Sequence, residues 1–119
     1  MGQQAITILT LTVLASAAIS ARQLVSPTGG VATAGGPILG AAETDAANGE
    51  YFAVNVLGSS PVIADGAITK GMELEVGTAG AAAEADTGRV IGIALEDAAD
   101  GAVFEALLIP AGIHPPAAP

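Results

Sequence analysis

The chain has 119 residues, no cysteine and twelve carboxylates against Arg22, Lys70 and Arg89, which gives a net charge of −9. This length predicts a single domain. The charge argues against nucleic acid and anionic membranes as partners. The lack of cysteine excludes a disulfide framework, a thiolate nucleophile and a cysteine-ligated zinc within this chain. Aromatic side chains are few, so we expect a thin core that gains stability from oligomerisation or from docking on a larger assembly.

The chain begins with an apolar segment that has no charge between Ala5 and Arg22. Threonine alternates with aliphatic residues from Ile6 to Val13, which is typical of a strand with one apolar and one hydroxyl face. A signal peptide and a membrane helix are the alternatives, but no basic residue precedes the segment. We expect residues 1–17 to form an N-terminal arm or strand, residues 18–110 a β-rich domain, and residues 111–119 a Pro/Ala-rich tail.

An internal repeat is the most informative feature of the sequence. Residues 37–57 align without gaps with residues 89–109, and both copies contain D-A-A-[ND]-G-x-x-F. Each copy predicts a β-hairpin: a short apolar strand, a turn, and a second apolar strand. A helical turn through Asp97–Ala99 is the competing local interpretation. The motif residues are Asp45, Gly49, Asp97 and Gly101, expected in the turns, and Phe52 and Phe104, expected as core anchors.

Short strands are also expected at 23–25 and 72–76, before each hairpin, and residues 77–83 form a small-residue loop in this interpretation. Gly40 and Gly92 fall inside predicted strands, where glycine often marks a bulge or a close backbone approach. Many short strands with glycine-rich turns indicate an all-β fold. We therefore predict a small β-barrel or sandwich of short strands, built from two similar hairpin-containing repeats, with an N-terminal extended arm.

We find no convincing catalytic, cofactor or metal residues in the sequence. The single histidine, His114, lies in the proline-rich tail, away from any rigid element that a general base requires. The acidic clusters at 43–45 and 96–100 lack the register of a calcium-binding loop and are better interpreted as solvated, capped turns. The sequence therefore predicts a protein that is not an enzyme and has no small-molecule substrate.

Two stretches of the second half, ADGAITKGM at 64–72 and TGRVIGIALEDAADG at 87–101, resemble the capsid cement, or head decoration, proteins of tailed bacteriophages. The resemblance covers residues 64–109 best and residues 18–57 more loosely. It implies a protein that binds the outer surface of a phage head and stabilises contacts between major capsid subunits, commonly as a homotrimer. It also implies a place on the virion, and in the host cytoplasm during assembly. The N-terminal segment and the tail are not part of the motif.

An exposed N-terminal strand is well suited to adding to a neighbour's sheet. The candidate partner-binding residues are accordingly its apolar members, namely Ile6, Ile8, Leu9, Leu11 and Val13. The main alternative function is that of another virion or cell-surface structural β-domain with an N-terminal anchor or export segment. A small enzyme or ligand-binding barrel is a further rival, disfavoured by the lack of a positioned histidine, cysteine or basic cluster.

Overall fold

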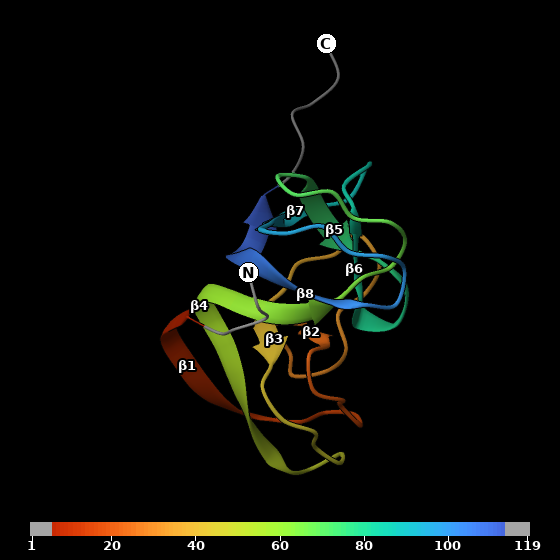
Figure 1. The fold of residues 1–119 in the computed structure, drawn as a ribbon. Helices are drawn as coiled ribbons and strands as arrows, with labels where there is room; N and C mark the ends of the chain where they lie inside the picture. Colours follow the sequence, from red (N-terminus) through yellow and green to blue (C-terminus); the bar gives the residue numbers. More distant parts are fainter. Residues whose placement is uncertain (1–5, 114–119) are drawn as a thin grey trace.

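The computed structural model describes the backbone of residues 6–113 and the side chains of residues 8–109. It confirms the predicted all-β class: antiparallel strands dominate, and one short 3-10 turn, η1 (Thr78–Gly80), interrupts them (Figure 1). The strands are β1 (Ile6–Leu14), β2 (Leu24–Val25), β3 (Gly40–Ala42), β4 (Tyr51–Ile63), β5 (Glu73–Val76), β6 (Ala82–Glu84), β7 (Val90–Ala94) and β8 (Val103–Ile113).

All the described strands belong to one continuous sheet that is nearly closed on itself. Its order is β2-β3-β4-β8-β7-β5-β6, and β1 pairs with β4 outside this path. A parallel bridge between Ala64 and Ala82 brings β6 back to the end of β4, and the Asp65 amide donates to the Ala82 carbonyl at 2.8 Å. The second half of the chain thus curls into a small barrel.

The internal repeat extends well beyond the two hairpins. Leu14 faces Tyr51 across β1 and β4, and Ile63 faces Val103 at the equivalent place across β4 and β8. Thr12–Ala53 and Pro61–Glu105 correspond in the same way. β1 is therefore the counterpart of the second half of β4. We call residues 6–57 the first repeat unit and residues 58–109 the second repeat unit.

The turn motifs hold each unit together in the same way. The Asp45 carboxylate accepts a hydrogen bond from the Ala21 amide at 2.7 Å, and Asp97 accepts one from the Lys70 amide at 2.8 Å. Gly49 and Gly101 have φ of 90° and 82°, the left-handed region that favours glycine. The alternative helical turn at 97–99 is not formed, because Ala98 makes an antiparallel bridge with Ile68.

The apolar core consists of two clusters that reflect the repeat. Phe52 (4% exposed) lies in the smaller cluster and Phe104 (0%) in the larger one. β2 and β3 separate the clusters: Val25 and Ala42 face the smaller, whereas Leu24 and Ala41 face the larger. Both faces of β2 and β3 are therefore buried. Because these two strands contribute side chains to both clusters, apolar residues are buried even though few of them are large.

Two segments differ from the sequence-based expectation. The small-residue stretch 77–83, expected as a loop, contains η1 and most of β6, because its alanines are small enough to pair closely with β5. β8 continues past Ile109 to Ile113, which faces Val90. Pro110 is accommodated because the register shifts between Val90 and Gly92, so the missing amide interrupts no paired position. The proposed tail residue His114 and residues 1–5 lie outside the described residues.

Gly40→Ala tests the close strand approach inside each unit. A Cβ at Gly40 would overlap the Asn55 carbonyl oxygen, and one at Gly92 would lie 2.5 Å from the equivalent Leu107 oxygen. We expect Gly40→Ala to lower the free energy of unfolding by about 2–3 kcal/mol, measured by urea denaturation. Gly49→Ala is the matched control, since a Cβ there meets nothing within 4 Å and costs only the left-handed backbone, about 1 kcal/mol. Equal losses would contradict the steric account.

Candidate functional site

Exposed apolar side chains gather on β1 and on the first half of β4. Ile8 is 79% exposed and Tyr51 72%, values far above those of core residues. No charged residue occurs in β1. Together these exposed side chains form what we call the apolar patch, which consists of Ile8, Leu9, Leu11, Leu14, Tyr51 and Leu57.

The strand register brings members of the apolar patch together in pairs. Leu9 lies opposite Leu57, and Leu14 lies opposite Tyr51. Cross-strand partners project from the same face of a sheet, so each pair forms one continuous apolar surface. The register shifts on both sides of Leu9, which leaves Ile8 without a Cα partner in β4. The side chain of Ile8 therefore projects from an irregular point of the strand.

The structure separates the candidate partner-binding residues into three groups. Ile8, Leu9 and Leu11 are exposed and belong to the apolar patch. Val13 is half-buried and packs against the smaller core cluster, so its side chain has a structural place. The side chain of Ile6 lies outside the described residues.

Three members of the patch were not among the sequence-based candidates: Leu14, Tyr51 and Leu57. Tyr51 is 72% exposed although it is one of only three aromatic residues in the chain. The repeat carries the missed signal, because Tyr51 corresponds to the half-buried Val103. A large aromatic residue in a position that needs only a valine indicates a surface site.

All six members of the apolar patch lie in the first repeat unit, whereas Leu107 (43%) is the one large apolar side chain of the second unit that is exposed among the described residues. In the second unit, the counterpart of Leu11 is Ser60, which is buried, and the counterpart of Leu14 is the half-buried Ile63. Most of the negative charge, in contrast, lies in the second unit. The first unit contains three carboxylates and Arg22, net −2, whereas the second contains nine carboxylates with Lys70 and Arg89, net −7.

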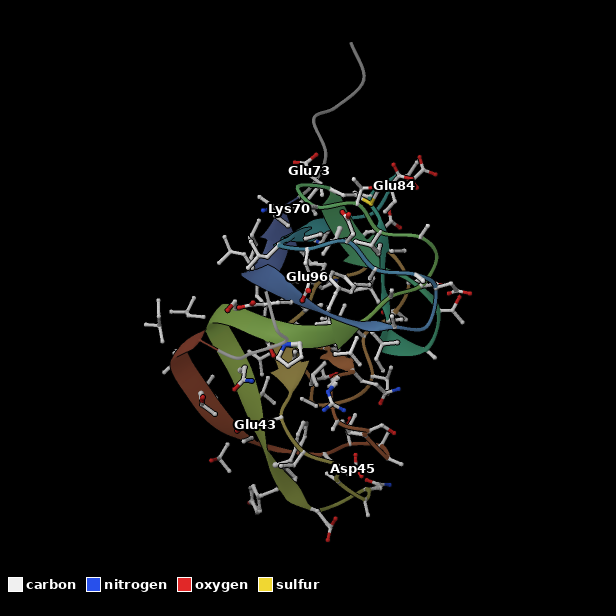
Figure 2. The ribbon with its side chains drawn as sticks, in the orientation of Figure 1. Glu43, Asp45, Lys70, Glu73, Glu84 and Glu96 are labelled. Carbon is white, nitrogen blue, oxygen red and sulfur yellow. The ribbon has the colours of Figure 1, made fainter. Side chains whose placement is uncertain are left out.

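Figure 2 shows that the charged residues of the two units lie at different ends of the molecule, with Glu43 and Asp45 at one end and Lys70, Glu73 and Glu84 at the other. A shallow depression lies between the last three of these residues. Among the described residues, no group of three potential ligands is placed to hold a metal ion. No helix in the described part of the chain has the length and apolarity needed to cross a membrane.

Buried polar side chains lie where β4 passes from the first unit to the second. Asn55 accepts a hydrogen bond from the Thr10 hydroxyl at 3.3 Å and donates to the Ser60 hydroxyl at 3.2 Å. The Ser59 hydroxyl donates to Oε2 of Glu105 at 2.5 Å, and Glu105 is only 1% exposed. Its Oε1 accepts no hydrogen bond from a described residue. These hydrogen bonds link β1 to β4 and β4 to β8, and Thr10 lies between Leu9 and Leu11 of the apolar patch.

A family model described as phage cement protein matches residues 3–109, which is most of the chain. The chain belongs to the phage cement protein family. Membership places it among the structural proteins associated with the phage capsid, in agreement with the resemblance of the 64–72 and 87–101 stretches. No curated protein matches the chain.

Among solved structures, this cement protein is similar to the crystal structure of the head fiber gp8.5 N base in bacteriophage phi29. The TM-score is 0.72 at 24% sequence identity, and the match covers 89% of this chain and 98% of that chain. At this identity the likeness concerns the fold. It shows that nearly the whole architecture described above, with both repeat units, also occurs in a second phage protein.

Asp97→Ala tests the turn bond that holds the second unit. Loss of the acceptor leaves the Lys70 amide unpaired at that turn, so we expect the free energy of unfolding to fall by about 1–2 kcal/mol. Asp86→Ala is the matched control, because it removes one exposed carboxylate whose oxygens accept no hydrogen bond in the described structure. Thermal unfolding of both variants decides the point, and a loss of equal size in Asp86→Ala would show that charge alone is responsible.

Proposed function

We propose that this cement protein binds the outer surface of a phage head and stabilises contacts between major capsid subunits, without catalysing a reaction. The observation that supports this role most directly is the apolar patch. An exposed cluster of large apolar side chains on one strand pair marks a protein-binding surface. Because the chain belongs to the phage cement protein family, we infer that this surface binds the phage capsid.

The division of charge suggests how the protein is oriented on the shell. The apolar, weakly charged first unit provides the contact, since charged groups are depleted at the centre of protein interfaces. The acidic second unit then faces solvent, where its net charge of −7 keeps neighbouring decorated sites apart. We also propose a homotrimer on the mature particle, assembled in the host cytoplasm, with residues 18–110 as the decoration domain and residues 1–17 supplying its first strand.

Full burial of an exposed large apolar side chain contributes about 1.5–3 kcal/mol. Ile8 and Tyr51, the two most exposed members of the apolar patch, therefore offer the largest gain on binding. Leu9, Leu11 and Leu57 are already more than half buried and contribute less. A small number of well-packed apolar anchors commonly dominates the affinity of such an interface.

The double variant Ile8→Ser, Tyr51→Ser tests the apolar patch. These side chains are 79% and 72% exposed, so we expect unfolding to change little and binding to undecorated capsid shells to weaken at least tenfold, about 1.4 kcal/mol. Co-sedimentation with shells measures the binding. Glu84→Ser, at an exposed site in the second unit, serves as the control and should bind like the unmodified protein. Unchanged binding by the double variant would refute the role of the patch.

A further inference from the structure

The outer edge of β1 carries unpaired backbone groups, and their direction can be established. The Ala53 carbonyl accepts a hydrogen bond from the Glu43 amide at 3.0 Å, so the backbone groups of Ala53 point away from β1. Thr12 lies opposite Ala53 and therefore forms a non-hydrogen-bonded pair with it. The amide and carbonyl of Thr12 point away from β4, to the side where no described strand pairs with β1.

The second unit shows what a protected version of this edge looks like. Pro61 is the counterpart of Thr12, and it faces Glu105. The Glu105 amide donates to Glu96 at 2.9 Å and its carbonyl accepts from Leu95 at 3.0 Å, so Pro61 also sits in a non-hydrogen-bonded pair. Its nitrogen is therefore turned outward, and proline has no amide hydrogen to offer an added strand.

The same edge of the second unit also carries another strand. Ile6 and Thr7 pair with Ser59 and Gly58 of β4. The equivalent positions in the first unit are Thr10 and Leu9, whose outer edge no described strand occupies. Within the part of the chain that the structure describes, the far end of β1 is covered, where Gly29 lies against the Leu14 carbonyl. The open stretch runs from Ile8 to Thr12, and all five side chains are exposed.

We propose that this open edge, Ile8–Thr12, takes up an extended, uncharged segment of a capsid subunit as an additional strand. The inference rests on the proposed function and specifies how the shell is held: by main-chain hydrogen bonds, with Leu9 and Leu11, which share one face of β1, packing against side chains of the added strand. A nine-residue edge strand without charge or proline is otherwise a liability that folded proteins avoid. In the second unit, Pro61 protects the equivalent edge. The open edge of β1 in the first unit therefore indicates that this edge binds a partner.

The occupant is a capsid segment rather than β1 of a second copy. Pairing of two β1 edges would join two chains about a twofold axis, whereas the proposed trimer requires a different surface on each side of its contact.

Thr12→Pro in the full-length protein tests the proposal. Because Pro61 occupies the equivalent place in an intact ladder, we expect Thr12→Pro to fold and to unfold at a temperature close to that of the unmodified protein. Its binding to undecorated capsid shells should fall at least tenfold. Thr12→Val is the matched control, since it keeps the amide and the strand-forming shape, and it should bind normally. If Thr12→Pro does not fold, hydrogen exchange in the unmodified protein, free and shell-bound, gives the answer: the outward-pointing amides of Thr10 and Thr12 should slow at least tenfold on binding.

Three results would overturn the proposal. Normal shell binding by Thr12→Pro, or unchanged exchange of the Thr10 and Thr12 amides, would exclude strand addition. Equal loss in Thr12→Val would assign the effect to the hydroxyl group. A lower mass of free Thr12→Pro in native mass spectrometry would show that the edge pairs with a second copy. Failure of the unmodified protein to bind shells would instead refute the proposed function, so the two failures are distinguishable.

Discussion

The architecture depends on one strand that serves two repeat units. β4 spans Tyr51–Ile63; its first half closes the first unit by pairing with β1 and β3, and its second half opens the second unit by pairing with β8. Gly58 lies between the halves with φ of 107°, a backbone conformation that other residues rarely adopt. Figure 1 shows β4 bending as it passes from one unit to the other. Because both units share this strand, their sheets merge into one.

The shared strand also explains the buried polar groups. A strand that changes its surroundings midway cannot keep one face apolar along its whole length, and Asn55, Ser59 and Ser60 lie on both sides of Gly58. Their hydrogen bonds to Thr10 and Glu105 are satisfied in one register of β1, β4 and β8. A slip by one residue would leave these groups buried without partners, which costs more than the bonds contribute. The polar groups thus favour the register that exposes the apolar patch.

The repeat motif D-A-A-[ND]-G-x-x-F predicted the paired strands because it places turn and core residues at fixed spacing. The rest of the duplication was harder to detect. VLASAAIS at 13–20 matches VIADGAIT at 62–69, but Leu14 and Ile63 are separated by 49 residues, whereas Gly40 and Gly92 are separated by 52. A gap-free comparison therefore misses the first strand of each unit. The exposure of Tyr51 and the burial of Glu105 depend on how the two units pack against each other, which local sequence patterns do not contain.

Two copies of one β-unit have thus diverged into different surfaces: an apolar, open-edged first unit and an acidic second unit whose edge is protected by Pro61. We propose on the basis of this asymmetry that the first unit is the one that contacts the capsid. A cryo-electron microscopy reconstruction of capsid shells decorated with the protein tests it most directly. The account predicts that β1 and the first half of β4 lie against the shell, while the depression around Lys70, Glu73 and Glu84 faces solvent. Density with the second unit on the shell and β1 exposed would contradict it.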